Sequence, residues 1–303
     1  MAGEVGVLVM AYGTPSSPDD LERYYTHIRR GRPPSPDQLA DLRGRYDAIG
    51  GLSPLLERTR AQLDGVALAL GDGYVVALGM KHAAPFVEDG MGELRAAGVD
   101  RAIGLVLAPH YSALSVGEYA ERARDAANGL PFTMIESWHL EDGYLDLVSA
   151  RVREAVSAVP AGSEVVFTAH SLPARVLDTG DPYPDQLRQT AEAVARRAGL
   201  ERWSTAWQSA GRTPEPWLGP DIIDVIRTLA AGGAPGVVVC PAGFVSDHLE
   251  VLYDLDVEAA AVARDSGLRF ARTRSLDDDP ALCRTLADVV GSVAGPPPRA
   301  GPA

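Results

Sequence analysis

The chain contains 303 residues, of which 46% are hydrophobic and 23% charged, a balance that excludes a disordered or fibrous protein. Its 28 basic and 41 acidic residues give a net charge of −13, which disfavours nucleic acid and anionic membranes as general partners. No apolar run approaches the roughly 20 residues of a membrane-spanning helix, and residues 1–10 lack the basic flank of a signal peptide. We therefore expect a folded cytoplasmic protein.

The first predicted element is a short strand at residues 5–10, which runs into a turn through Ala11-Tyr12-Gly13-Thr14-Pro15. A tyrosine at the carboxyl end of a parallel strand lies at the edge where such sheets bind ligands. Its phenol can stack on a flat ligand or bind a metal through oxygen, although packing in the core is the commoner role of a tyrosine ring. Tyr12 is therefore a candidate ligand contact.

A basic segment follows between residues 23 and 45. It holds six arginines and two aspartates, so that its local charge is six minus two, or +4: Arg23, Arg29, Arg30, Arg32, Arg43 and Arg45, with Asp37 and Asp41. Guanidinium groups bind carboxylates and phosphates through two parallel hydrogen bonds. The segment therefore indicates a specific anionic ligand, with a solvated helix face as the alternative.

Short apolar runs alternate along the chain with longer amphipathic stretches. The runs cover residues 5–10, 74–78, 102–107, 164–168 and 236–240, and the stretches 117–127, 144–158 and 185–198 have helical spacing. This alternation predicts parallel sheets with crossover helices. Two of the strands end in similar loops that carry His110 and His170, which suggests two related halves with ligands bound at the strand ends.

His170 is the histidine that best fits a catalytic role. It lies in the strand-end loop 168–173, where an imidazole can accept a proton or bind a metal near neutral pH. A lone histidine is more often structural, so this interpretation depends on the fold bringing Glu250 beside it. The other histidines have no comparable partner by spacing and are interpreted as structural or supporting: His27, His82, His110, His139 and His248.

An acidic stripe follows the strand at 236–240. Glu250, Asp254 and Glu258 recur at every fourth residue, after a possible helix N-cap at Ser246 or Asp247, and would share one helix face. Like charges at this spacing cost about 0.2–0.5 kcal/mol per pair, so the stripe needs a cation or arginine neighbours. Its oxygen ligands suit a hard or borderline divalent metal, whereas a plain acidic surface helix is the alternative.

Several common sites lack support. The sequence has no G-x-G-x-x-G after a strand, and no G-x-x-x-x-G-K-[ST], G-x-S-x-G or H-E-x-x-H pattern, which argues against dinucleotide, nucleoside-triphosphate, serine-hydrolase and zincin sites. The two cysteines, Cys240 and Cys283, form no C-x-x-C pair. Neither a disulfide framework nor a cysteine-ligated zinc or iron–sulfur site is therefore expected.

Along nearly its whole length the sequence resembles the ferrochelatase family. The resemblance rests on residues 9–15, 23–32, 45–46, 49–54, 107–110, 169–173, 181–186, 207–209, 216–220 and 243–250. It implies a chelatase-like α/β fold of two similar Rossmann-like lobes, each a parallel four-stranded sheet flanked by helices, with a porphyrin in the cleft between them. We accordingly expect an N-terminal lobe at 1–145, a C-terminal lobe at 146–277, a helix at 278–294 that packs back on the first lobe, and a disordered tail at 295–303.

The resemblance also implies roles for individual residues. His170 and Glu250 correspond to the catalytic pair that handles Fe²⁺, and Tyr12 to a potential axial ligand of the product iron. Contacts with the porphyrin are implied for Tyr12, Arg29, Arg45, Tyr46, Ser53 and Tyr119. Arg45, Asp254 and Glu258 resemble an outer site for a hydrated cation such as Mg²⁺.

The detailed likeness is to the Gram-positive type of the family, whose substrate is coproporphyrin III and whose product is coproheme. This implies a lyase of haem biosynthesis, in which the arginines and Ser53 anchor the propionates of the porphyrin. Some relatives carry a [2Fe–2S] cluster on cysteines, and because two separated cysteines cannot supply four ligands, no cluster is expected.

Other activities stay open at this point. A ferrochelatase acting on protoporphyrin IX, a chelatase for another tetrapyrrole and metal, and a non-catalytic tetrapyrrole carrier would share parts of the pattern. The pattern of Tyr12, Arg29 and Ser53 argues against another tetrapyrrole, and the acidic stripe argues against a carrier. A monomer that contacts other haem-pathway enzymes only transiently is the expected state.

Overall fold

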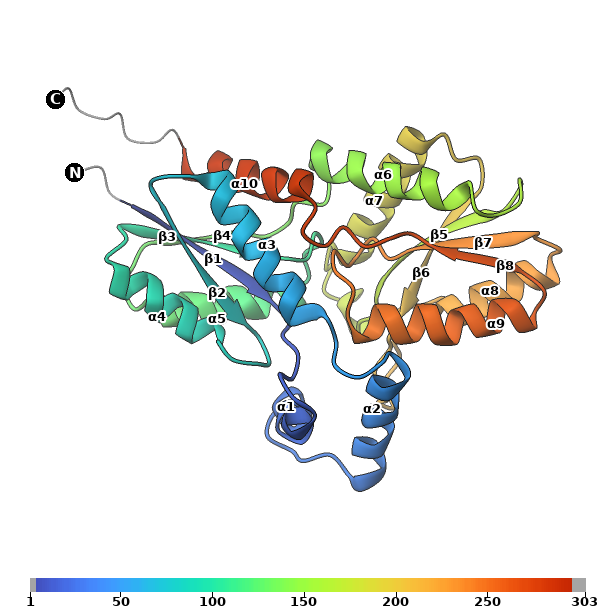
Figure 1. The fold of residues 1–303 in the computed structure, drawn as a ribbon, viewed down its shortest axis with the longest axis horizontal. Coiled ribbons are helices and arrows are strands. Elements are labelled where there is room, and N and C mark those ends of the chain that lie inside the picture. Colours follow the sequence, from blue (N-terminus) through green and yellow to red (C-terminus); the bar gives the residue numbers. More distant parts are fainter. Residues whose placement is uncertain (1–3, 296–303) are drawn as a thin grey trace. The chain divides into compact units, whose positions relative to one another are not determined.

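The structure is a computed structural model that describes residues 4–295. Its contacts divide the chain into two units (Figure 1): unit 1 comprises Met1–Arg43, Leu52–Trp138 and Asp277–Ala303, and unit 2 comprises Gly44–Gly51 and His139–Leu276. The tail expected at 295–303 lies, apart from Gly295, outside the described residues. Within residues 4–295, no helix combines the length and apolarity that crossing a membrane requires.

Unit 1 is built on a parallel sheet with the strand order β2-β1-β3-β4. The strands are β1 (Val5–Ala11), β2 (Tyr74–Met80), β3 (Arg101–Val106) and β4 (Phe132–Ile135). Helices α4 (Val87–Ala97) and α5 (Glu118–Ala127) pack on one face, and α3 (Leu55–Leu70) and α10 (Pro280–Ala294) on the other (Figure 1). Shorter elements complete the chain order: η1 (Pro18–Asp20), α1 (Leu21–Ile28), α2 (Pro36–Ala48) and the π-helical turn η2 (Ala113–Gly117).

The sequence of β1 explains its place inside this sheet. All of its residues are buried and none is charged, as expected for a strand covered by helices on both faces. Leu8 and Met10 pack with Val87, Met91 and Leu94 in the core beneath α4.

Unit 2 repeats the arrangement with the strand order β6-β5-β7-β8. Its strands are β5 (Glu164–His170), β6 (Trp203–Gln208), β7 (Gly236–Cys240) and β8 (Arg269–Arg272). Helices α6 (Asp142–Val156) and α7 (Tyr183–Ala198) cover one face, and α8 (Ile222–Ala231), the π-helix η4 (Val251–Ala259) and α9 (Ala260–Asp265) cover the other (Figure 1). A 3₁₀ turn, η3 (Ala174–Val176), follows β5.

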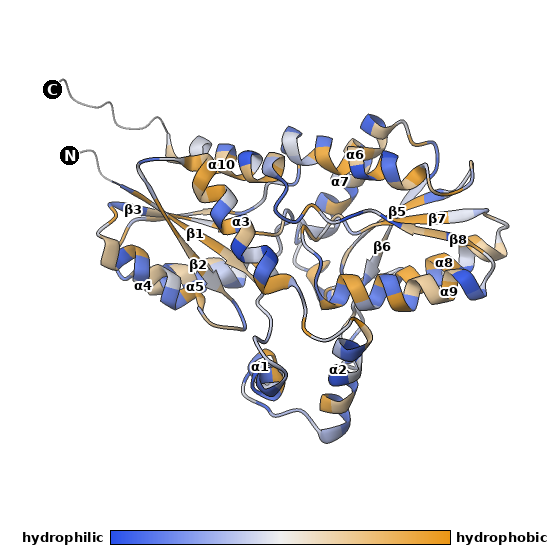
Figure 2. Ribbon diagram, viewed as in Figure 1, coloured by the Kyte–Doolittle hydropathy of each residue, from blue (hydrophilic) through white to orange (hydrophobic). Residues whose placement is uncertain are grey.

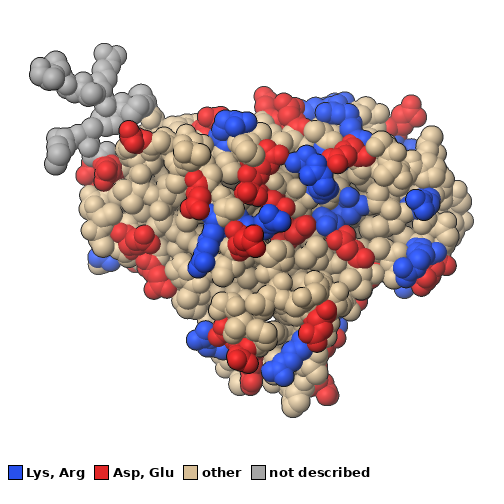
Figure 3. Space-filling model, viewed as in Figure 1, with Lys and Arg blue, Asp and Glu red and all other residues tan. Residues whose placement is uncertain are grey.

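The two sheets have the same topology, which confirms the predicted pair of similar parallel four-stranded halves. In Figure 2 the inner strand β1 is predominantly hydrophobic, whereas the helices alternate hydrophobic and hydrophilic residues. Acidic and basic side chains are interspersed over the face shown in Figure 3. Tyr12 directly follows β1 and His170 ends β5, so each occupies the carboxyl end of an inner strand of its sheet.

Candidate active site

His170 is held at the end of β5, opposite Gln208 at the end of β6. Its ring atom Nδ1 lies 2.5 Å from the carbonyl oxygen of Ser171. Because a carbonyl oxygen only accepts hydrogen bonds, Nδ1 carries a proton and donates it. The phenol of Tyr183 donates to the carbonyl oxygen of His170 at 3.1 Å. The ring orientation is thereby fixed, and Nε2 is the atom left to meet a partner.

Glu250 supplies that partner. Its Oε1 lies 3.5 Å from His170 Nε2, its Oε2 lies 3.7 Å from His248 Nε2, and the side chains of His170 and Glu250 are 34% and 33% exposed. Gln208 Nε2 donates to the carbonyl oxygen of Glu250 at 3.4 Å, while its Oε1 accepts from Thr168 at 2.7 Å. The fold thus brings together the two residues that the sequence analysis selected as a pair, and leaves them accessible.

Electrostatics favour an ion pair between these two side chains. Burial disfavours a charged imidazole, but the Glu250 carboxylate and the Ser171 carbonyl outweigh that effect and raise the pKa of His170. Burial also disfavours a charged carboxylate, yet His170 and His248 together hold the pKa of Glu250 well below its ordinary value. The pair therefore stores a proton on His170 and a negative charge on Glu250, which suits exchange of a proton for a metal cation.

Asp254 lies deeper, with 9% of its side chain exposed, and its Oδ1 is 3.5 Å from Nη1 of Arg45. Ser209 donates its hydroxyl to Oδ2 of Asp254, and Ser209 holds a left-handed backbone conformation with φ of 61°, which is uncommon for a residue other than glycine. Burial, followed by the charge of Glu250, raises the pKa of Asp254 to about 6, against the opposing effects of Ser209 and Arg45. Asp254 can therefore gain or lose a proton near neutral pH.

The acidic stripe lies on a π-helix rather than the expected α-helix. Glu250 occupies the N-cap of η4, and Asp254 lies within it, buried, while Glu258 is exposed near its end. A π-helix has more residues per turn than an α-helix, since its hydrogen bonds join residues five apart, so residues four apart still fall close to one face. The expected N-cap at Ser246 or Asp247 was wrong, because the Asp247 carboxylate accepts instead from Ser275 and Arg272.

We expect Asp254→Asn to gain stability relative to the unaltered protein as the pH rises from about 4 to about 7. The folded protein binds a proton at Asp254 with a pKa of about 6, above the ordinary value of 3.8 for an aspartate. This proton therefore stabilises the fold fully below the lower value, and the contribution is lost as the pH rises through about 6. Asparagine does not titrate, so the difference between the two unfolding free energies should shift by up to about 3 kcal/mol over this range.

Urea unfolding of both proteins at each pH measures that shift. Asp185→Asn is the control, because its carboxylate is 73% exposed on α7. A difference between Asp254→Asn and the unaltered protein that stays constant with pH would contradict the assignment.

In unit 1, Tyr12 is 42% exposed and its ring lies 4.6 Å from that of His82. The Nδ1 atoms of His82 and His27 are 3.0 Å apart, so one donates a proton to the other. Burial, with the positive charges of Lys81, His27 and Arg122, lowers the pKa of His82 to about 3. A neutral imidazole therefore supports the partly exposed Tyr12 ring.

Tyr119 is only 3% exposed, which is less than we expect for a residue that contacts substrate. Lys81 Nζ lies 5.2 Å from the centre of its ring and 2.5 Å from Glu118 Oε2. Burial, first among several causes, raises the pKa of Tyr119 well above its ordinary value. Tyr119 therefore stays a neutral phenol beside a partly exposed ion pair.

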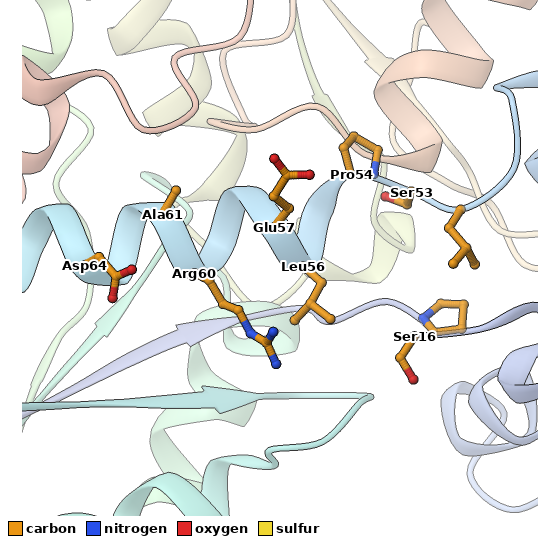
Figure 4. A pocket seen from close by; sticks show the side chains of 10 residues that line it. Ser16, Ser53, Pro54, Leu56, Glu57, Arg60, Ala61 and Asp64 are labelled. Atoms are coloured by element: carbon orange, nitrogen blue, oxygen red, sulfur yellow. The ribbon is translucent and has the colours of Figure 1, made fainter.

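Ser53 lines a hollow of about 660 Å³ in unit 1 (Figure 4). Pro15 and Ser16 lie on one side of it, and residues of α3 such as Arg60 lie on the other. The Ser53 hydroxyl accepts from the backbone N–H of Leu55 at 3.3 Å, at the start of α3. The volume of the hollow is in the range of small-molecule sites, but neither His170 nor Glu250 lines the hollow.

The arginines of the basic segment have separate surroundings. Arg23 pairs with Asp20 at 2.9 Å and Arg30 with Glu118 at 3.3 Å, whereas the Arg29 guanidinium lies 5.6 Å from the ring of Tyr25. Arg45 belongs to unit 2, where its guanidinium lies 4.9 Å from the ring of Tyr253. Tyr46, also in unit 2, is buried.

Within residues 4–295, no three His, Cys, Asp or Glu side chains are grouped so that they could hold a metal ion by themselves. Cys240 and Cys283 are both buried free thiols, and burial raises the pKa of the Cys240 thiol to about 12. Any metal handled at His170 and Glu250 therefore needs ligands from elsewhere, such as water or a bound substrate.

A family model named Ferrochelatase matches residues 4–293. This chain belongs to the ferrochelatase family. A coproporphyrin III ferrochelatase of Anoxybacillus flavithermus is 44% identical over 94% of this chain and 95% of its own length. One from Geobacillus thermodenitrificans is 45% identical over 94% and 95% of the two chains. The predicted resemblance is therefore confirmed.

Solved structures add support for the fold. The chain aligns with SirB from Bacillus subtilis, solved with Fe³⁺, at a TM-score of 0.62 and 11% identity over 95% of this chain and 94% of that one. CbiX, the terminal enzyme of siroheme biosynthesis in denitrifying bacteria, aligns at 0.57 and 16% identity over 94% and 97%. At such identities the likeness concerns the fold alone, and it agrees with the predicted chelatase-like architecture.

Two residues around the pair were not selected from the sequence: Gln208, which donates to the backbone of Glu250, and Ser209, which donates its hydroxyl to Asp254. His248, interpreted as structural or supporting, contacts Glu250. His248 stands only two residues before Glu250, which was a usable signal. Gln208 and Ser209 end a neighbouring strand, and only the strand order of the sheet reveals that they face this segment.

Proposed function

We propose that this ferrochelatase inserts Fe²⁺ into coproporphyrin III to form coproheme, a step of haem biosynthesis. The observation that carries the proposal is the contact between His170 and Glu250, at 3.5 Å, on accessible side chains. Relatives that are 44% and 45% identical over nearly their whole length bear the name coproporphyrin III ferrochelatase. That extent of identity favours a shared substrate over protoporphyrin IX or another tetrapyrrole.

In the proposed reaction Fe²⁺ replaces two protons on the pyrrole nitrogens, so the site has to receive both protons and position one dication. Glu250 is charged and accessible, and it would attract Fe²⁺ as substrate. His170 would release its stored proton toward solvent when the cation weakens its attraction to Glu250. The freed Nε2 would then hand over the metal, or accept the two pyrrole protons one after the other and pass each one on to solvent. Both roles use the two atoms that face each other in the structure, Nε2 of His170 and Oε1 of Glu250.

Asp254 and Glu258 would carry protons and cations between this pair and solvent. Asp254 titrates near neutral pH, with a pKa raised by burial to about 6, which is the range that proton transfer requires. We propose that Arg45, Asp254 and the exposed Glu258 form an outer site for a hydrated cation such as Mg²⁺. Water would supply most of its ligands, since Mg²⁺ usually keeps several.

The same proposal assigns porphyrin binding to the residues that the family resemblance implies. Tyr12 offers an exposed phenol as stacking surface and axial ligand of the product iron, and Ser53 lines a hollow of suitable size. Arginine forks match propionate carboxylates, which gives Arg29 and Arg45 their proposed roles. Tyr46 and Tyr119 would shape the binding site from buried positions.

Anaerobic insertion of Fe²⁺ into coproporphyrin III and protoporphyrin IX, followed in parallel by absorbance, tests this function. We expect turnover of coproporphyrin III and little or none of protoporphyrin IX. Preference for protoporphyrin IX would support the chelatase activity but contradict coproporphyrin III as the substrate. Tight binding of both without turnover would favour a tetrapyrrole carrier.

We also propose that the enzyme works without an iron–sulfur cluster. The sequence has two cysteines, and a [2Fe–2S] cluster usually needs four ligands. Protein purified anaerobically should show neither the visible absorbance of a cluster nor acid-labile sulfide. Detection of both in stoichiometric amounts would contradict this expectation.

The sequence further predicts a cytoplasmic monomer that contacts other haem-pathway enzymes only transiently. Sedimentation equilibrium of the purified protein checks the oligomeric state. A concentration-independent mass near 32.0 kDa is the expected result.

A further inference from the structure

Arg272 ends β8, and its side chain is only 12% exposed. Its Nε and Nη2 contact the two carboxylate oxygens of Asp256 at 2.7 and 2.8 Å, and its Nη1 lies 3.1 Å from Oδ1 of Asp247. Two parallel hydrogen bonds fix the direction of a contact as well as its length. One guanidinium therefore holds two separate points of the same segment.

The segment between those two points carries the candidate site. His248, Glu250 and Asp254 all lie between Asp247 and Asp256. Much of the segment is η4, and π-helical backbone is rare and occurs often at functional sites. A conformation of this kind persists where surrounding contacts hold it in place. The contacts of Arg272 with Asp247 and Asp256 lie at the two ends of this segment and can hold its backbone in place.

Helix geometry places the contact between Arg272 and Asp256 on the side of the helix opposite to Asp254. Asp256 follows Asp254 by two residues, which is about half a turn, so the two carboxylates point to opposite sides of the helix. The fork of Arg272 thus contacts the side of the helix away from Asp254.

Hydrogen bonds also connect Arg272 and the residues that follow it to the sheet and to Asp247. The backbone N–H of Thr273 donates to Val239 on β7 at 3.0 Å, Arg272 Nη1 donates to the carbonyl oxygen of Thr273 at 3.1 Å, and Ser275 donates its hydroxyl to Asp247 at 2.6 Å. A site is positioned well when the groups that support it belong to rigid elements.

We propose that Arg272 is a positioning residue that sets Glu250 and Asp254 against His170 for metal insertion, without touching substrate. This inference rests on the proposed function. Lysine carries a point charge and cannot reproduce the planar fork, so Arg272→Lys keeps the charge and removes the two-point contact. Asp256→Asn provides a second route, because it weakens the same contact and leaves Arg272 in place.

The chain offers a matched control in Arg274→Lys. Arg274 makes the same kind of fork with Glu154, at 3.1 and 3.0 Å, but both side chains are more than half exposed and Glu154 lies on α6. We expect Arg272→Lys and Asp256→Asn to lower kcat for Fe²⁺ insertion into coproporphyrin III by about 10- to 100-fold, the usual effect of losing a supporting contact at a metal site. KM for the porphyrin should stay within about twofold, and Arg274→Lys should change neither constant.

A spectroscopic measurement separates this inference from the proposed function. The ring ¹⁵N chemical shifts of His170, recorded on metal-free protein at one fixed pH, report its contact with Glu250. They should change in Arg272→Lys and Asp256→Asn but not in Arg274→Lys, even if the unaltered protein turns over no porphyrin. If the unaltered protein is active and both variants match Arg274→Lys in kcat and in these shifts, the positioning role is wrong.

Discussion

His170→Ala and Glu250→Gln are each expected to lower Fe²⁺ insertion by at least about 100-fold, since general acid–base groups contribute about 10²–10⁴-fold to a rate. Each variant also removes one half of the ion pair at 3.5 Å, so the remaining group loses the charge that set its pKa. Porphyrin affinity should change little, because neither residue is assigned to bind the propionates. Anaerobic turnover gives the first quantity, and fluorescence quenching of coproporphyrin III gives the second.

The double variant provides the sharper test of this pair. Two residues that act as one unit give strongly non-additive losses, so His170→Ala with Glu250→Gln should be about as slow as the slower single variant. Glu192→Gln is the control, since this carboxylate is 46% exposed on α7 and pairs with Arg196. Turnover retained in both single variants would remove the pair from the reaction, whereas losses that multiply in the double variant would mean that the two residues act independently.

Much of the architecture was predictable from the sequence because the inner strands of parallel sheets are strongly apolar. The strands β1, β5 and β7 are almost free of charged residues, and strands buried on both faces produce such apolar runs. The strands β4, β6 and β8 were missed. β8 is Arg-Phe-Ala-Arg at the edge of its sheet, where half-exposed positions tolerate charge and the apolar signal disappears.

The central pair was predictable for a related reason. Strand ends collect ligands in parallel sheets, and the acidic stripe follows one of these strands, so His170 and Glu250 were candidates before their distance was known. The helix type was not predictable, because a spacing of four residues fits α- and π-helices alike. The proximity of Arg45 to Asp254 was implied by the family resemblance alone, since nothing local to residues 44–51 indicates that they join unit 2.

Gly243→Ala is expected to destabilise unit 2 by about 1–3 kcal/mol, the usual cost of overpacking, and to impair insertion as well. A Cβ at this position would lie 2.5 Å from Cβ and 2.9 Å from Cα of Ala169, closer than van der Waals contact allows. The backbone N–H of Gly243 also donates to Thr168 at 3.0 Å. Any relief of the clash therefore moves the end of β5, and with it His170.

Gly92→Ala is the matched control for the added methyl group. A Cβ at Gly92 meets no atom within 4 Å, and alanine is favoured over glycine inside a helix by about 1 kcal/mol, so this variant of α4 should be neutral or more stable. Urea unfolding compares the stabilities, and insertion measured well below the unfolding range compares activities. Full activity and unchanged stability in Gly243→Ala would mean that the close packing between Gly243 and Ala169 does not hold His170 in place.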